Sequence, residues 1–157
     1  MSEEELEKVG EQALLGHLVA QAQVAHAKYA PFDSGSLEAW LADPECLRHP
    51  VRLVHEFGPM AMHQFAHVDL DWRNTEADGR VIYLRPLLRE RPDLVLLAVA
   101  YMVPVVNYGD VVTDAHCLAY GATLLGLTED EYYLQICSVA DFVGAETRFP
   151  GQSGCGC

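Results

Sequence analysis

The side chains best suited to chemistry gather in residues 55–71, HEFGPMAMHQFAHVDLD. This stretch holds three of the seven histidines of the chain, three acidic residues and two methionines. His63 and His67 are four residues apart, a spacing that puts two imidazoles on one face of a helix, where they can bind one metal ion. The sequence therefore predicts a metal site centred on these two histidines. Its further candidate ligands are His55, Glu56, Asp69 and His116.

The five residues from His63 to His67 look like the zinc-binding helix motif of the zincins, with one departure. The second residue of that motif is a glutamate, which acts as the general base that activates the metal-bound water. Gln64 stands at this position here, and a glutamine side chain cannot accept that proton. The departure predicts metal binding without peptidase activity. Imidazole and carboxylate ligands favour zinc over iron or copper, since zinc needs only four of them.

The backbone of this stretch has two interpretations. Gly58-Pro59 interrupts regular structure, and a helix can begin with Pro59 at its first position. Alternatively, His67–Trp72 is extended, because apolar and polar residues alternate through it. The extended form places one histidine and two acids on the same strand face, which is also a surface that can hold a metal. A third interpretation is that the histidines are surface or hydrogen-bonded residues that bind no metal.

The chain has five cysteines, an odd number that in a reducing cytosol favours free thiols, metal ligands or redox chemistry over a disulfide framework. Two of them, Cys155 and Cys157, lie in a terminal Gly-Cys-Gly-Cys sequence. As thiolates they can hold a soft metal ion, and as a dithiol they can form a small strained disulfide. We therefore predict that this pair is reactive, whereas Cys117 and Cys137 fall in apolar helical segments that should protect them.

The charge of the chain limits its partners. Among 157 residues there are 23 acids and 10 bases, which give a net charge of −13. This argues against nucleic acid and anionic membrane as the main partners. Four of the ten bases lie close together in the sequence, and we expect them to pair with acids of the same molecule. They are Arg80, Arg85, Arg89 and Arg91.

Two segments bear on localisation. The beginning of the chain, MSEEELEKV, has neither the basic start nor the apolar core of a secretion signal. The most apolar run, Leu94–Val106, is shorter than the roughly 20 residues that a membrane span requires, and Pro104 interrupts it. The sequence therefore predicts a soluble, cytoplasmic protein with no membrane partner.

Periodic and capped segments predict a mainly α fold: a single-domain bundle of five to seven helices over residues 1–143, followed by a flexible tail, residues 144–157. At most one small β-hairpin is expected, near residues 68–84. The segment Leu94–Val103 is hydrophobic on nearly every side and should lie at the centre. Helices are expected at residues 3–27, 36–41, 50–57, 94–103, 111–125 and 128–142, with caps at Ser36, at Asp110 or Asp114, and at Thr128.

These patterns support two hypotheses about function, and neither names a substrate or a reaction. The first is a small acidic metal-binding protein with a histidine-centred site and a Cys-x-Cys tail capable of redox chemistry or metal binding. The second is a non-catalytic helical interaction module that works as a homo-oligomer, in which the histidines are incidental. The alanine-rich first helix and the high apolar content favour the second hypothesis.

Overall fold

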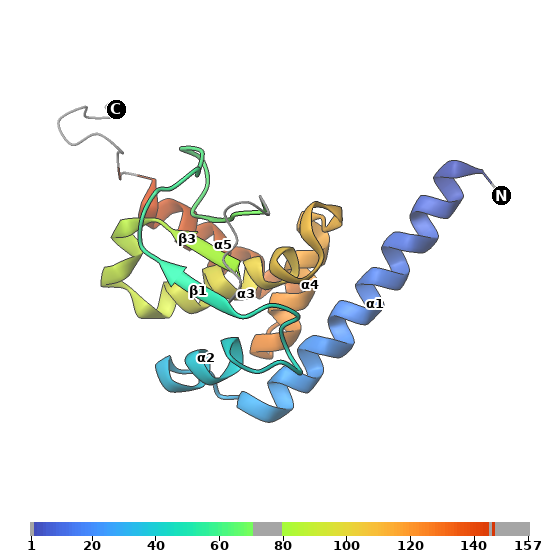
Figure 1. The fold of residues 1–157 in the computed structure, drawn as a ribbon, viewed down its shortest axis with the longest axis horizontal. Coiled ribbons are helices and arrows are strands. Elements are labelled where there is room, and N and C mark those ends of the chain that lie inside the picture. The colour runs from blue at the N-terminus through green and yellow to red at the C-terminus, as the bar shows by residue number, and fades with distance from the viewer. Residues whose placement is uncertain (1, 71–79, 145, 147–157) are drawn as a thin grey trace.

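The computed structural model describes residues 2–70, 80–144 and 146 (Figure 1). Within these residues the chain forms five α-helices and a small three-stranded sheet, so the predicted mainly helical fold is confirmed. The helices are α1 (Glu3–Tyr29), α2 (Ser34–Leu41), α3 (Pro92–Tyr108), α4 (Asp114–Leu125) and α5 (Glu129–Val143). The strands are β1 (Val51–Val54), β2 (Ala66–Val68) and β3 (Arg80–Leu84), and short 3-10 helices follow β3 at Pro86–Glu90 and α3 at Gly109–Val111.

The apolar helix α3 forms the centre of the molecule, as its sequence predicts. Ten of its residues are buried, and it contacts β2 and β3 of the sheet as well as α4 and α5 (Figure 1). It runs through Pro104 to Tyr108, five residues beyond its predicted end. A proline inside a helix removes one backbone hydrogen bond, and the burial of Val103 and Val106 beside it offsets that cost.

Within the part of the chain that the structure describes, one segment is long and apolar enough to cross a membrane. It is Pro92–Val111, with 20 residues, and 56 % of its most apolar window is buried inside the molecule. The central helix of a soluble protein has this same composition, because most of its surface packs against other elements. Its hydropathy is therefore accounted for by its place in the core.

The sheet differs from the predicted hairpin by one added strand. β3 lies in the middle, parallel to β1 and antiparallel to β2, so the order is β1-β3-β2. The pairing of β2 with β3 confirms a hairpin-like element at this place, although the residues between 70 and 80 lie outside the described residues. The helix predicted at residues 50–57 is wrong. Val51 and Leu53 pack on the core while Arg52 between them is exposed, which is the two-residue period of a strand.

The caps of the helices show which local signals were reliable. Thr128 caps α5 in a reciprocal arrangement with Glu131, as predicted. The predicted cap of α2 at Ser36 is wrong, because Asp33 accepts the Ser36 backbone N–H at 3.0 Å and so begins the helix two residues earlier. The predicted cap of α4 at Asp110 or Asp114 is also wrong, since Thr113 occupies that position.

A close approach of two helices depends on Gly121 in α4. A Cβ atom built on this residue would lie 2.2 Å from the ring of Tyr132 in α5. The Tyr132 ring is fully buried, and its hydroxyl donates a hydrogen bond of 2.8 Å to the Leu97 carbonyl oxygen in α3. The absence of a side chain at Gly121 therefore lets one tyrosine connect α3, α4 and α5.

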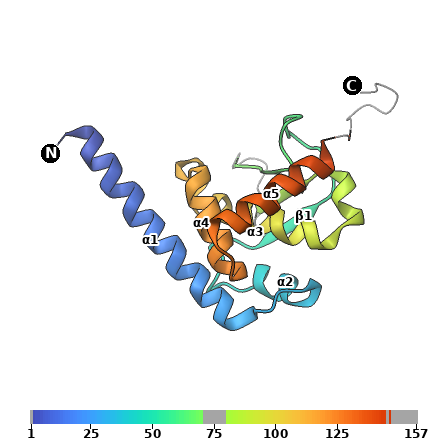
Figure 2. The same cartoon turned by 180° about the vertical axis from the view of Figure 1, so that it is seen from behind.

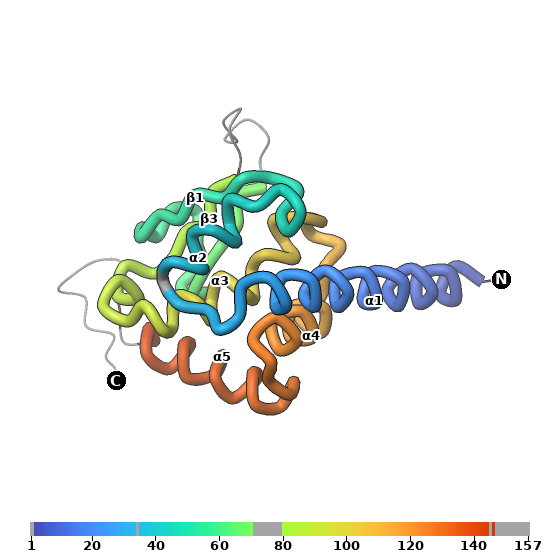
Figure 3. The backbone as a smooth tube through the Cα atoms, turned by 90° about the horizontal axis from the view of Figure 1, so that it is seen from below, coloured from blue at the N-terminus to red at the C-terminus, as the bar shows by residue number. Residues whose placement is uncertain are grey.

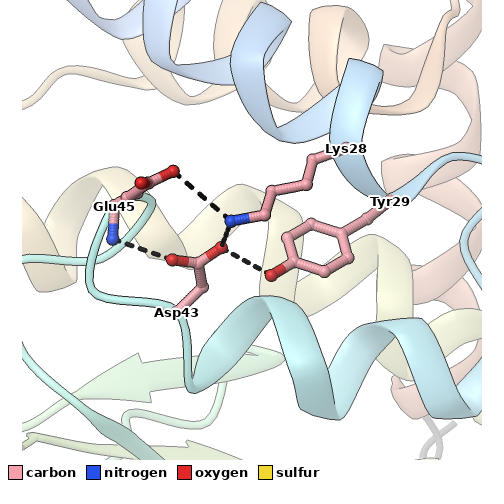
Figure 4. Close-up of polar contacts among 4 residues, drawn as sticks. All are labelled: Lys28, Tyr29, Asp43 and Glu45. Atoms are coloured by element: carbon pink, nitrogen blue, oxygen red, sulfur yellow. Dashed lines mark hydrogen bonds and ion pairs between the residues drawn. The ribbon is translucent and has the colours of Figure 1, made fainter.

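A polar cluster ties the end of α1 to the turn after α2 (Figure 4). The buried Asp43 carboxylate accepts hydrogen bonds from Lys28 Nζ at 2.6 Å and from the Tyr29 hydroxyl at 2.5 Å. Its other oxygen accepts the Glu45 backbone N–H at 2.9 Å. The Lys28 ammonium, followed by the Tyr29 hydroxyl, holds the pKa of the Asp43 carboxyl well below its usual range. The cluster thus fixes the position from which α1 extends.

The first half of α1 extends beyond the rest of the molecule in all views (Figure 2, Figure 3). Residues 2–13 are all exposed, and burial of α1 begins only further along, where Leu18, Ala22 and Ala25 pack against α4 and the core. An isolated helix of this length is marginal in water, although Ser2 and Glu5 close a capping box at its start. This arm presents surface that no described residue covers.

Candidate functional site

The stretch predicted to hold a metal is not helical. Gly58 has a positive φ of 51°, and a Cβ atom there would lie 2.5 Å from the Tyr83 ring, so the chain turns tightly onto β3. A second turn follows, in which the Gln64 backbone N–H donates to the Ala61 carbonyl oxygen and the Gln64 side chain accepts the Ala61 N–H. His63 lies in this turn and is exposed. The helical interpretation that would stack it on His67 is therefore wrong.

The extended interpretation describes the end of this stretch better. His67 is the middle residue of β2, opposite Tyr83 of β3, and it is half-buried. Its neighbours Ala66 and Val68 point into the core, so His67 and Asp69 belong to the opposite face of the strand. Asp71, which the same interpretation placed on this face, lies outside the described residues. Glu56 is exposed in the loop after β1.

His116 has a structural role. It stands in the first turn of α4, where its Nδ1 accepts the Thr113 backbone N–H at 3.0 Å. Its Nε2 lies 3.0 Å from the Glu11 carbonyl oxygen in α1. Because Nδ1 accepts from an N–H and a carbonyl oxygen can only accept, Nε2 must carry the proton. Both ring nitrogens are thus occupied in joining α4 to α1, which leaves neither for a metal ion.

Among the described residues, no three His, Cys, Asp or Glu side chains converge where they could hold a metal ion. Cys46 and Cys117 are buried, and burial raises the pKa of their thiols to about 11 and about 12. Cys137 is only half-buried, so the apolar helical segment in which it lies does not bury its thiol as it buries that of Cys117. The predicted reactive pair, Cys155 and Cys157, lies outside the described residues.

A buried arginine organises the loop that the sequence singled out. Arg85 is 2 % exposed, and its guanidinium donates to the backbone carbonyl oxygens of Met62 and Gln64. It also donates to the Glu146 carbonyl oxygen and stacks on the Phe57 ring at 5.1 Å. The guanidinium therefore holds the loop after β1 against the end of β3. Its Nη1 also lies 3.9 Å from a Glu146 carboxylate oxygen, so the predicted pairing of this arginine with an acid is confirmed.

A large cavity lies over α3, between the junction of α1 with α2 on one side and α5 on the other. Its volume is about 920 Å³, which is within the range of pockets that hold drug-sized molecules. Its wall is mainly apolar and includes Phe32, Leu37, Val95, Leu96, Leu125 and Leu127. Such a surface favours an apolar ligand, since burial contributes about 25 cal/mol per Å² of apolar area.

Two basic side chains enter this cavity from the sheet side. His55 follows β1, and Arg89 lies in the 3-10 helix after β3. Burial, followed by the neighbouring Arg89 guanidinium, lowers the pKa of His55 from its ordinary value, and the Arg85 backbone opposes part of this shift. Its Nδ1 is buried and has no hydrogen-bond partner among the described residues. Arg89 is exposed, and its one hydrogen bond within the described chain goes to the His55 carbonyl oxygen at 3.4 Å.

The acidic side chains of the cavity are already engaged. Asp33 caps α2 through Ser36, and these hydrogen bonds lower the pKa of its carboxyl. Asp93 forms a two-bond ion pair with Arg91, at 3.0 and 2.9 Å. On the α1 side, His26 Nδ1 lies 2.8 Å from the Leu124 carbonyl oxygen and must donate to it. Within the described residues, the cavity therefore combines an apolar wall with one cation, Arg89, that has no carboxylate partner.

No protein-family model, no curated protein and no solved structure matches this chain. The function must therefore be inferred from the geometry of the molecule alone.

Sequence reasoning missed the cavity, although it singled out His55 as a ligand and grouped Arg89 with the other arginines. No local signal marked Arg89, because Glu90 is adjacent to both Arg89 and Arg91 in the sequence. Only the structure shows that Asp93 pairs with Arg91 and that Arg89 hydrogen-bonds to the His55 carbonyl oxygen. The remaining wall comes from segments far apart in the chain, and no local pattern connects them.

Proposed function

We propose that the protein is a non-catalytic binding module that holds a small molecule with an apolar body in the cavity over α3. The observation that carries this proposal is the cavity itself, with its volume of about 920 Å³ and its mainly aliphatic wall. Buried apolar area of this kind, together with a few polar groups, is typical of ligand sites.

The lining residues favour binding over catalysis. The described wall contains no serine, threonine, cysteine or lysine that could act as a nucleophile. Its two carboxylates are held in a helix cap and in an ion pair, so neither is free to take a proton from a substrate. The groups that remain are better suited to orient a ligand than to transform it.

Filling the cavity tests this function. We take N-phenyl-1-naphthylamine as a neutral probe whose fluorescence rises in apolar surroundings, and Leu96→Trp as the variant that fills the cavity from α3. The wild-type protein should bind the probe saturably, and the variant should weaken binding at least about tenfold, which corresponds to ~1.4 kcal/mol. Leu134→Trp is the matched control, because Leu134 lies on α5, is 66 % exposed and does not line the cavity.

The proposal fails if the probe does not bind, or if both tryptophan variants bind it as tightly as the wild type does. Circular dichroism of each variant shows whether the helical fold is kept, so that a loss of binding in Leu96→Trp can be assigned to the filled cavity. If Leu96→Trp does not fold, Leu127→Trp fills the same cavity from the loop before α5.

A second function, self-association, is favoured by the outer face of α1. This face is defined by seven apolar or glycine residues spaced three or four apart, all of them exposed: Leu6, Val9, Ala13, Gly16, Ala20, Val24 and Ala27. At 100° per residue they lie opposite the buried Leu18, Ala22 and Ala25. An exposed apolar face of this length on a helix is typical of helix pairing. We propose that it binds a second copy of the chain.

A further inference from the structure

The charge balance of the cavity indicates which end group its ligand carries. Arg89 and two aspartates are the fully charged side chains of the wall. Asp93 is neutralised by its ion pair with Arg91, and Asp33 accepts the backbone N–H at the positive end of α2. The Arg89 guanidinium meets only a neutral carbonyl oxygen in the described structure. In a chain with a net charge of −13, the uncompensated charge of this cavity is therefore positive.

The donor geometry of Arg89 also favours an anionic end group on the ligand. A guanidinium offers five N–H donors in a planar fork that matches the two oxygens of a carboxylate. One of its nitrogens, Nη2, is directed to the His55 backbone by a long hydrogen bond of 3.4 Å, so most of the donors remain for a ligand. His55 lies beside it with a buried Nδ1 that lacks a partner within the described residues. A carboxylate at this edge would accept hydrogen bonds from the Arg89 guanidinium and from the Nδ1–H tautomer of His55.

The apolar part of the wall indicates the chemistry of the other end of the ligand. From Arg89 the lining continues over α3 to Leu125 and Leu127, at the far end of α4. The volume of about 920 Å³ accommodates a body of drug-like size. Resting on the proposed binding function, we propose that the ligand is an amphipathic carboxylate, with its head group at Arg89 and His55 and its apolar body between Val95, Leu96 and Leu127.

Three probes with one body and different heads test this inference. They are dodecanoate, dodecanol and dodecylammonium, each used below its aggregation limit and measured by displacement of N-phenyl-1-naphthylamine. The wild type should bind dodecanoate more tightly than dodecanol by about tenfold, as expected for a hydrogen-bonded ion pair that is partly open to solvent. In Arg89→Gln this preference should disappear, because dodecanoate loses its cationic partner. Arg52→Gln, an exposed arginine of β1 that does not line the cavity, should keep the preference.

Both an aliphatic chain and an aromatic ring system can carry the carboxylate. 1-Naphthoate, measured in the same displacement assay, distinguishes the two sources. Each acid is compared with the neutral alcohol that has the same apolar body. A larger preference for dodecanoate over its alcohol indicates a fatty acid as the ligand, and a larger preference for 1-naphthoate over its alcohol indicates an aromatic acid. Either result supports a carboxylate head group only if the preference for the acid over its neutral alcohol is lost in Arg89→Gln.

The failures are distinguishable. If the neutral probe binds in the cavity but dodecanoate and dodecanol bind equally, the binding function stands and the carboxylate inference is overturned. Preference for dodecylammonium would also overturn it, and would assign head-group recognition to Asp33 and Asp93. If no probe binds, the binding function itself is overturned. A dodecanoate preference that survives in Arg89→Gln refutes the assigned head-group position.

Discussion

The histidines of this chain differ in what their ring nitrogens can still bind. His116 uses both nitrogens within the molecule, one for Thr113 and one for Glu11. His63 and His67 hydrogen-bond to none of the other described residues, and His67 shares a strand face with Asp69. Among the described residues these side chains do not converge on one metal position, so if zinc binds, we expect His63 and His67 to hold it together with Asp71, the terminal cysteines or water.

The metal hypothesis predicts stoichiometric zinc in protein purified without a histidine tag. Replacing both histidines, in His63→Ala with His67→Ala, should abolish it, because an aspartate alone holds zinc weakly. Elemental analysis by mass spectrometry measures the content. His17→Ala is the control, since His17 is exposed on α1 and far from this stretch in the sequence. Metal-free wild-type protein, after purification in zinc-containing buffer, would reject the hypothesis.

Residue type and spacing predicted which histidines could bind a metal ion, but the hydrogen bonds and turns of the fold determine the role that each one has. The spacing of His63 and His67 implied a shared helical face, yet Gly58 and the turn at Gln64 prevent the helix. His116 was a reasonable ligand by type, and its capping role depends on Thr113 three residues earlier. A histidine is a rare partner in that reciprocal cap, where glutamate or glutamine is usual, so sequence reasoning passed over it.

At the scale of elements, the long segments were predicted well and the short ones were not. α1 and α5 begin at strong caps, and α3 has an unbroken apolar sequence, so each was found within a few residues except at the end of α3. β1 has four residues, too few for periodicity to separate a strand from a helix. Its conformation is set by parallel pairing with β3, which lies 29 positions further along.

The approach of α4 to α5 gives a prediction about stability. Gly121→Ala should lower the free energy of unfolding by about 1–3 kcal/mol, the usual cost of overpacking a core, because the new methyl group would meet the Tyr132 ring. Gly10→Ala is the matched control. A Cβ atom there has no neighbour within 4 Å, so an alanine should stabilise α1 by roughly 0.5–1 kcal/mol. Urea unfolding measures both, and equal effects of the same sign would contradict the packing argument.

At the scale of the whole molecule, the cavity is assembled from parts that no local pattern joins. Its wall combines the α1–α2 junction, the residue after β1, the start of α3 and the loop before α5. Sequence reasoning placed α3 at the centre, but it could not predict that α2 and α5 leave part of that helix uncovered. The same limit applies to α1. Its length was predicted, but its first half extends past its neighbours because the first turn of α4 meets α1 at Glu11.

The outer face of α1 favours an antiparallel pair of helices. The first turn carries Glu3, Glu4 and Glu5, and the last turn carries His26 and Lys28. Antiparallel pairing therefore brings acidic and basic ends together, and it also opposes the two helix dipoles favourably. With the pair centred between Gly16 and His17, Val9 of one copy faces Val24 of the other. These two valines are 56 % and 52 % exposed in the single chain, so pairing would bury both.

This register can be tested by charge exchange. Val9→Glu should weaken the dimer at least about tenfold in dissociation constant, ~1.4 kcal/mol, because a carboxylate would be buried against a valine. Adding Val24→Lys to it should restore the dimer, since opposite charges then face each other twice across an antiparallel pair. In a parallel pair the same double variant would place like charges together and stay dissociated. Sedimentation equilibrium measures the association, with Leu134→Glu on the exposed side of α5 as the control. A wild-type chain that sediments as a monomer at every concentration tested would refute self-association through α1.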